Sequence, residues 1–232
     1  MDDVGASRSR HIDLAVRVPP TLSDGARLGL DVTRWIAEGL VDIVVAGAGF
    51  IPFDASVDEF VHVAEDTDCL IYGPIEHLRP AVDDEVIRAI AARHWDAGAS
   101  GIYLFNYFSK SAEWKRRVFS ELADPDILCR LDKRYHMDNT RFRWDYSRDL
   151  SPRDLHDYAF QNAVPIVQLP VTLAETFTPM GPKLRFDIAD DVGAAEAEGV
   201  LVQCELSLKL TGYSEEDEME VWLNGEQLSS VF

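Results

Sequence analysis

Residues 41–49 read VDIVVAGAG, a short run of β-branched residues that ends in a glycine-rich exit. The same order of apolar run, polar loop and amphipathic segment occurs four times within residues 11–137. The four apolar runs are residues 11–18, 41–45, 69–72 and 101–105. Because these runs are nearly continuous rather than alternating, they indicate parallel strands that are covered on both faces. Strand–helix alternation at roughly 30 residues per unit predicts a doubly wound sheet or a barrel, and the pattern alone does not choose between them.

The segments between the runs carry helix signals. The predicted helices span residues 23–38, 56–66, 85–97 and 112–122, and a further helix starts at Asp124-Pro125. In the first, Leu28, Val32, Trp35 and Ile36 fall on a single apolar stripe. Gly39 and Gly98 are expected to close the first and third helices, since glycine favours the position just past a helix end.

The pattern changes after residue 137. Residues 138–163 show little periodicity and are predicted to form a linker. In residues 200–210 apolar and polar side chains alternate, which predicts a half-solvated antiparallel strand. Asn224-Gly225 predicts a type I′ hairpin turn. Residues 164–232 are therefore expected to form a small antiparallel β-sandwich-like domain. It is expected to be incomplete, because a sandwich takes about seven strands and fewer can be placed.

The net charge of the chain makes some classes of binding partner unexpected. The 232 residues hold 22 Lys and Arg against 41 Asp and Glu, a net charge of −19. Such a surface repels phosphate groups, so neither nucleic acid nor a membrane face is expected to bind. Cys69 and Cys204 lie in apolar runs, where buried free thiols are expected. The polar start of the chain lacks a signal-peptide core, which predicts a cytoplasmic protein. An extracellular or periplasmic location stays open if the true N-terminus lies upstream.

Five stretches carry a family resemblance: GLDVTRWIAEGLVDIVV, YGPIE, AARHWDAGASGIYLFNYF, LDKRYHM, and a tail containing DIADD and EVWLNG. The first four, in this order, resemble the C-terminal half of bacterial glycosyl-hydrolase-like barrel proteins related to glycoside hydrolase family 10. The tail is similar to the β-sandwich appended to some of those proteins. The resemblance implies that residues 1–137 are strands 5 to 8 of a (β/α)₈ TIM barrel. Since a whole barrel takes about 250 residues, strands 1 to 4 are expected to be missing from this chain.

Barrel active sites lie at the C-terminal ends of the strands. The candidate site residues on this criterion are Arg17, Tyr72, Glu76, His77, Asn106 and Tyr107, with the glycine-rich loop 46–49. The resemblance places Glu76 where related hydrolases carry their nucleophile. The remaining residues are candidates for binding sugar hydroxyls or stacking on sugar rings.

Each candidate also has a structural interpretation. Glu76 is alternatively a solvated loop carboxylate paired with Arg79, Asn106 caps its own loop, and the tyrosines pack at strand ends. His94 and Trp95 lie on the third helix and are expected to be packing residues. Spacing along the chain shows no cluster of metal ligands and no complete nucleotide-binding motif, so neither a metal nor a cofactor is expected.

The leading hypothesis is a glycoside-hydrolase-like protein that acts on or binds a poly- or oligosaccharide. A retaining glycosidase needs a second carboxyl group as acid/base, and the resemblance places that group on the missing half. Whether the chain is an enzyme therefore depends on another chain completing the barrel. The alternatives are a non-catalytic carbohydrate-binding or interaction protein, and a truncated product without a function of its own. The open edges of a half barrel also predict self-association or a partner chain.

Overall fold

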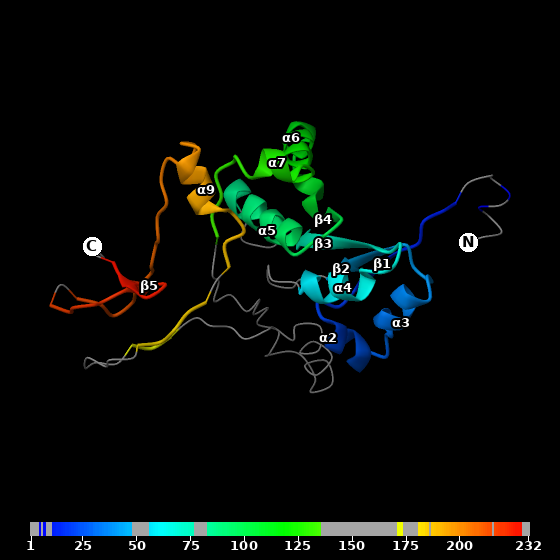
Figure 1. The fold of residues 1–232 in the computed structure, drawn as a ribbon, viewed down its shortest axis with the longest axis horizontal. Helices are drawn as coiled ribbons and strands as arrows, with labels where there is room; N and C mark the ends of the chain where they lie inside the picture. Colours follow the sequence, from blue (N-terminus) through cyan, green and yellow to red (C-terminus); the bar gives the residue numbers. More distant parts are fainter. Residues whose placement is uncertain are drawn as a thin grey trace. The chain divides into compact units, whose positions relative to one another are not determined.

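The computed structural model describes Gly5, Ser7 and residues 11–47, 56–76, 83–135, 171–173, 181–185, 187–214 and 216–228 (Figure 1). The chain divides into two compact units, Met1–Asp191 and Val192–Phe232. The predicted linker, residues 138–163, lies outside the described residues. No helix in the described ranges combines the length and apolar character needed to cross a membrane.

The first unit contains a parallel sheet of four strands in the order β1-β2-β3-β4. The strands are β1 (Ala15–Val18), β2 (Ile43–Ala46), β3 (Leu70–Glu76) and β4 (Gly101–Phe105). Each strand pairs with the next one along the chain. A doubly wound sheet reverses its strand order at a switch point, and the described sheet contains no such reversal. The predicted α/β character is confirmed.

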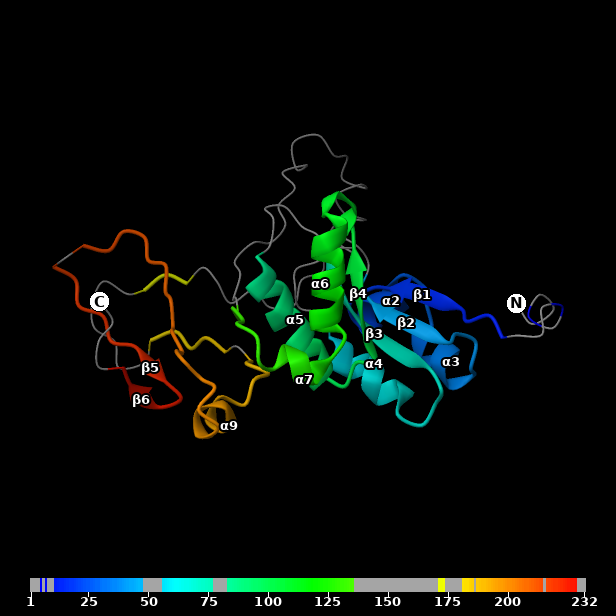
Figure 2. The ribbon, with the colours of Figure 1, turned by 90° about the horizontal axis from the view of Figure 1, so that it is seen from above.

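Helices connect the strands. They are α2 (Leu22–Arg27), α3 (Val32–Ala37), α4 (Val57–Ala64), α5 (Asp84–Asp96), α6 (Ala112–Leu122) and α7 (Pro125–Leu128), with a short 3₁₀ turn η1 at Tyr107–Ser109. Helices α4 and α5 both contact β3. Figure 2 shows the strands side by side from a second direction.

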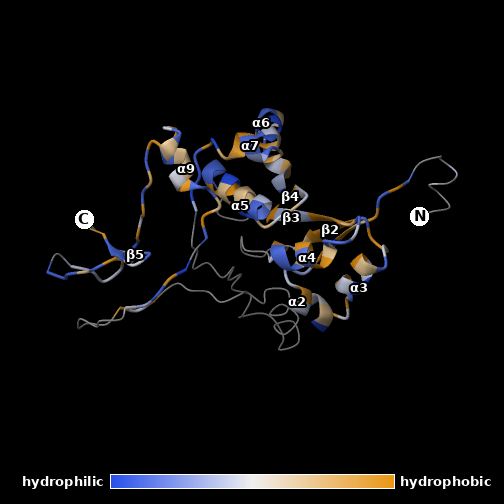
Figure 3. Cartoon of the chain, in the orientation of Figure 1, coloured by the Kyte–Doolittle hydropathy of each residue, from blue (hydrophilic) through white to orange (hydrophobic). Residues whose placement is uncertain are grey.

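The helices pack on one face of the sheet. Val18, Val44 and Ile71 are buried in a cluster with side chains of α3 and α4. Ile75 is buried in a second cluster with side chains of α5 and α6. The register aligns Val44 with Ile71, and alternate residues of a strand point to the same side, so all four side chains project from one face. In Figure 3 the strands are largely hydrophobic, whereas α5 and α6 carry both kinds of residue.

The prediction of one helix over residues 23–38 is wrong. The chain forms two short helices, because Gly29 has a positive φ of 82° that a helix does not accept. Asp31 then caps α3 by accepting a hydrogen bond from the backbone N–H of Arg34 at 3.1 Å. Leu28, which the stripe placed in the core, ends α2 and is 48% exposed.

Strand β3 is longer than the predicted run of residues 69–72. It continues through Gly73 and Pro74 to Glu76, so Glu76 is the last strand residue rather than part of a loop. Pairing with β2 stops at Tyr72, and from there β3 pairs with β4 alone. A proline is tolerated where one side of a strand has no partner, because its missing N–H then leaves no ladder position empty.

Several local predictions are confirmed. Strand β4 and helix α6 have the predicted bounds. Asp124 caps α7 with Pro125 in the first helical turn. Strands β1 and β2 begin later than predicted, since residues 11–14 and 41–42 lie outside the ladder.

The second unit has little regular structure among its described residues. It contains α9 (Val192–Ala197) and a hairpin of β5 (Trp222–Leu223) and β6 (Glu226–Gln227). Asn224 and Gly225 have φ of 52° and 92°, which confirms the predicted turn. The strand predicted over residues 200–210 is wrong, because alternation forms a strand only where a partner pairs with it. Val202 is 98% exposed there.

Cys69 is buried as predicted, whereas Cys204 is exposed.

Candidate functional site

The C-terminal ends of the four strands meet at one edge of the sheet. The register aligns Val18 with Ala46, and Glu76 with Phe105. Arg17 lies one residue before the end of β1, and Gly47 follows β2 directly. Because parallel strands end at the same edge, residues far apart in the sequence come together here.

The face of the sheet opposite the helices carries three aromatic side chains and one arginine, with the buried Val45 and Pro74 between them. Tyr72 comes from β3, and Tyr103 and Phe105 come from β4; all three are partly exposed. The rings of Tyr103 and Phe105 stack with centroids 6.4 Å apart. The ring of Tyr72 lies over Gly101, where an added Cβ atom would come within 2.9 Å of Cζ of the tyrosine. We call Arg17, Tyr72, Tyr103 and Phe105 the open-face residues.

Arg17 links the two outer strands of the sheet. Its Nε donates a hydrogen bond to the carbonyl oxygen of Gly47 at 2.6 Å. Its guanidinium carbon lies 3.9 Å from the centre of the Phe105 ring, in the geometry of a cation–π contact. The guanidinium is therefore held at the C-terminal edge, over the end of β4.

This contact shows that the sheet curls. The register aligns Arg17 with Gly101 through the two middle strands, so Phe105 lies three strands across and four residues further along. In a flat sheet that offset would separate the two Cα atoms by about 19 Å, beyond the reach of the two side chains. The sheet is therefore twisted and curled so that the C-terminal end of β4 approaches Arg17 on this face.

The predicted site residues are only partly brought together. Arg17 and Tyr72 lie on the open face, and Glu76 ends β3 beside Phe105. Asn106 follows β4 in the left-handed conformation, with φ 62° and ψ 19°. Tyr107 is buried and stacks on Trp114 with centroids 5.4 Å apart, so its ring lies in the core. His77 falls outside the described residues.

Tyr103 and Phe105 were not among the predicted site residues. The signal was present in the sequence, because GIYLF places its two aromatic residues two positions apart and therefore on one face of a strand. Their shared face becomes the open one because Ile102 and Leu104 pack against the helix cluster.

His94 lies on the other side of β3, within the core. Its Nε2 donates a hydrogen bond to the carbonyl oxygen of Pro74 at 3.0 Å. Burial lowers the pKa of His94 to about 4, so the ring is neutral at pH 7. This position supports the predicted packing role of His94. The indole N–H of Trp95, the other predicted packing residue, donates a hydrogen bond to the carbonyl oxygen of Leu122.

A second group of polar side chains lies before the strands begin. His11, Asp13 and Asp42 each offer a ligand atom, and these atoms all lie within 4.8 Å of one another. The Leu14 N–H, followed by the His11 ring, lowers the pKa of Asp42, which keeps this carboxyl group ionised. Spacing along the chain did not reveal this cluster, because Asp42 is distant from the other two in the sequence.

Comparison of the chain with protein-family models finds no match, and comparison with curated proteins finds none either. Geometry and chemistry therefore carry the functional assignment.

Proposed function

We propose that this chain is a glycoside-hydrolase-like protein that binds a poly- or oligosaccharide at the C-terminal edge of the β1–β4 sheet. The observation that carries the proposal is the contact of Arg17 with Phe105, which gathers polar and aromatic groups from the two outer strands on one face of the sheet. Aromatic faces suit the C–H faces of sugar rings, and a guanidinium donates hydrogen bonds to hydroxyl oxygens.

The sheet supports a barrel as the parent architecture. Sequential parallel order and helices on a single face are both features of a (β/α)₈ barrel. We propose that β1 to β4 correspond to the last four of its eight strands. Among the described strands, β1 and β4 each pair on one side alone. We propose that a second copy of the chain pairs with these edges, since unpaired edges recruit further strands.

Binding is better supported than hydrolysis. Glu76 ends β3, where it is our candidate nucleophile. A retaining mechanism needs a second carboxyl group about 5–5.5 Å away. At this edge the described residues 18–20, 47 and 106–110 contain neither Asp nor Glu. Hydrolysis would therefore require a carboxyl group from another chain or another part of this one, whereas sugar binding requires none.

The proposal is tested by screening the chain against immobilised neutral oligosaccharides and measuring affinity for any saccharide that binds. Phe105→Ala and Arg17→Met should each weaken binding by about tenfold, the effect of losing one stacked ring or its cation partner. Phe119→Ala is the matched control, since Phe119 is 52% exposed on α6, away from the open face. Equal losses in all three variants, or binding of no saccharide, would contradict the proposal.

Enzyme activity is tested separately on aryl glycosides. If the chain turns over any of them, Glu76→Gln should abolish turnover while leaving saccharide binding in place. Turnover that survives this change would remove Glu76 as the nucleophile. Light scattering should find a dimer, and a monodisperse monomer would contradict completion by a second copy.

A further inference from the structure

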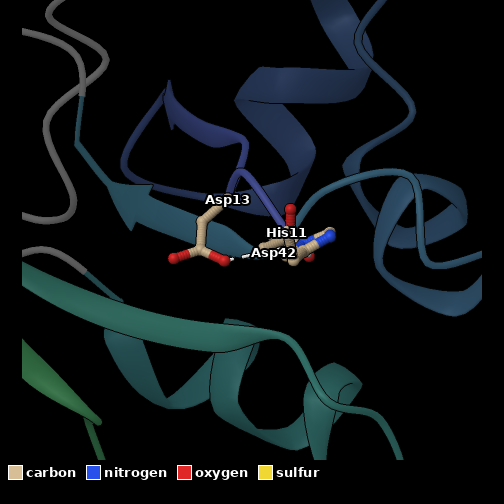
Figure 4. A group of neighbouring side chains, drawn as sticks. All are labelled: His11, Asp13 and Asp42. Carbon is tan, nitrogen blue, oxygen red and sulfur yellow. Dashed lines mark hydrogen bonds and ion pairs between the residues drawn. The ribbon is translucent and has the colours of Figure 1, made fainter. Parts of the chain in front are cut away.

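His11, Asp13 and Asp42 converge on the surface before β1 and β2, at the end of the sheet opposite the saccharide site (Figure 4). His11 and Asp13 lie two residues apart just before β1, with Nε2 of His11 3.5 Å from Oδ1 of Asp13. The backbone ties Asp42 to this segment, because its N–H donates to the Leu14 carbonyl oxygen at 3.0 Å.

The distances between the three side chains suit a bound metal ion. Nε2 of His11 lies 3.0 Å from Oδ1 of Asp42 and 3.5 Å from Oδ1 of Asp13. Ligand bonds of 2.0–2.2 Å in a tetrahedral zinc site place neighbouring ligand atoms about 3.4 Å apart. An ion can therefore sit between the three donor atoms after small side-chain movements.

Asp42 is oriented in the way that metal-ligating carboxylates usually are. Its Oδ2 accepts a hydrogen bond from the backbone N–H of Leu14 at 2.7 Å. Its Oδ1 forms a hydrogen bond with Nε2 of His11, a contact that a bound ion would replace. A hydrogen bond to the second oxygen fixes the carboxylate and prepares the first oxygen to coordinate.

A comparison within the chain separates this cluster from an ordinary surface pair. His62 also lies near a carboxylate, with its Nδ1 3.3 Å from Oε1 of Glu65. Of the described residues, however, only the group around His11 gathers three potential ligands. One imidazole with two carboxylates is a donor set that divalent transition metals accept.

We propose that His11, Asp13 and Asp42 form a three-ligand site for a divalent transition-metal ion with the ligand preference of Zn²⁺. Water completes the coordination, as in zinc sites with three protein ligands. The proposal is independent of saccharide binding, because the open-face residues play no part in it.

The experiment measures Zn²⁺ binding to the full chain by calorimetry, without an affinity tag. Cys129 and Cys204 are exposed, so both are replaced by serine in every sample to remove competing thiolates. One Zn²⁺ should bind per chain. His11→Gln and Asp13→Asn should each weaken binding by roughly tenfold or more, the scale of losses at metal sites. His62→Gln is the matched control and should bind as the parent does.

Asp13→Asn keeps the test decisive if His11→Gln fails to fold, because the Asp13 side chain is 67% exposed and has no packing role. Wild-type affinity in Asp13→Asn would overturn the proposal. So would equal losses in His62→Gln, or the absence of Zn²⁺ binding at millimolar metal. Co²⁺ provides an independent readout, since a site without sulfur ligands shows visible absorption but no thiolate charge-transfer band.

Discussion

His94 and Gly73 share one small volume between α5 and β3. A Cβ atom added at Gly73 would lie 2.3 Å from Cγ of His94 and 2.6 Å from its Cβ. The clash is with the base of the histidine side chain, which cannot move away without shifting the helix. Glycine at this position therefore allows α5 to lie close against the strand that carries Glu76.

Gly73→Ala is expected to lower the free energy of unfolding by about 3 kcal/mol, because it overpacks the core. Gly101→Ala is the comparison, since its Cβ atom would meet the far end of the Tyr72 ring, which can swing into the open face. Urea denaturation measures both. A milder effect in Gly73→Ala than in Gly101→Ala would contradict this packing.

His94 should also make stability depend on pH. Its pKa of about 4 in the folded chain lies below the ordinary 6.5. The unfolded chain therefore binds the proton more readily, and the folded state loses about 3 kcal/mol as pH falls from 6.5 to 4. His94→Gln keeps a donor for the Pro74 carbonyl and should flatten this part of the profile. Identical pH profiles of unfolding for the two proteins would refute the assignment.

At the scale of elements, the break between α2 and α3 depends on one backbone conformation. Gly29 has a φ of 82°, with no atom near the place of a Cβ. Gly25 lies inside α2, where a Cβ would make only ordinary contacts at 3.6 Å. Gly29→Ala should destabilise the chain by about 1 kcal/mol, and Gly25→Ala should stabilise it by up to about 1 kcal/mol. The opposite order in thermal unfolding would favour one continuous helix.

Motifs of a few neighbouring residues correctly predicted the elements that such short stretches determine by themselves. The GIYLF run and the Asp124-Pro125 cap are each complete in a few residues, and the structure has both where predicted. The extension of β3 through Pro74 depends on which strands pair with it. A short stretch of sequence does not contain that information. Residues 200–210 show the converse, because their strand-like alternation has no pairing strand among the described residues.

The candidate site, like the fold, could be predicted from the sequence only in part. Strand ends located Arg17 and Glu76, because any parallel sheet brings such residues to one edge. Tyr72 was expected at a strand end but lies within β3, aligned with Gly101 at the start of β4. Tyr107 could not be placed, since the left-handed turn at Asn106 sends its ring into the core. The contact of Arg17 with Phe105 required the curvature of the sheet, which sequence does not give.

At the scale of the first unit, a partly buried ion pair fastens residues 187–190 to the helical layer. Lys133 Nζ lies 2.8 Å from Oδ1 of Asp190, and the lysine side chain is 3% exposed. The Tyr135 hydroxyl donates to the other oxygen of Asp190 at 3.0 Å. Arg93 adds a hydrogen bond to the Asp187 carbonyl. These contacts hold a segment that is distant in sequence against the end of α5.

Lys133→Met should cost about 1–2 kcal/mol, because the Asp190 carboxylate loses its cation but is 25% exposed and keeps the hydrogen bond from Tyr135. It should also speed amide exchange in residues 187–190. Arg185→Met is the control, since the Arg185–Asp187 pair is 88% and 79% exposed and should contribute little. Unchanged exchange in Lys133→Met would show that the ion pair does not hold the segment.

The claim that the C-terminal edge of the sheet binds saccharide is tested most directly by NMR. A saccharide found to bind in the oligosaccharide screen is titrated into labelled chain, and shifts are followed at the open-face residues and in Val192–Phe232. We predict that the resonances of Arg17, Tyr72 and Phe105 move together with a single dissociation constant. Shifts confined to residues 192–228, with the open face unchanged, would contradict the proposed site.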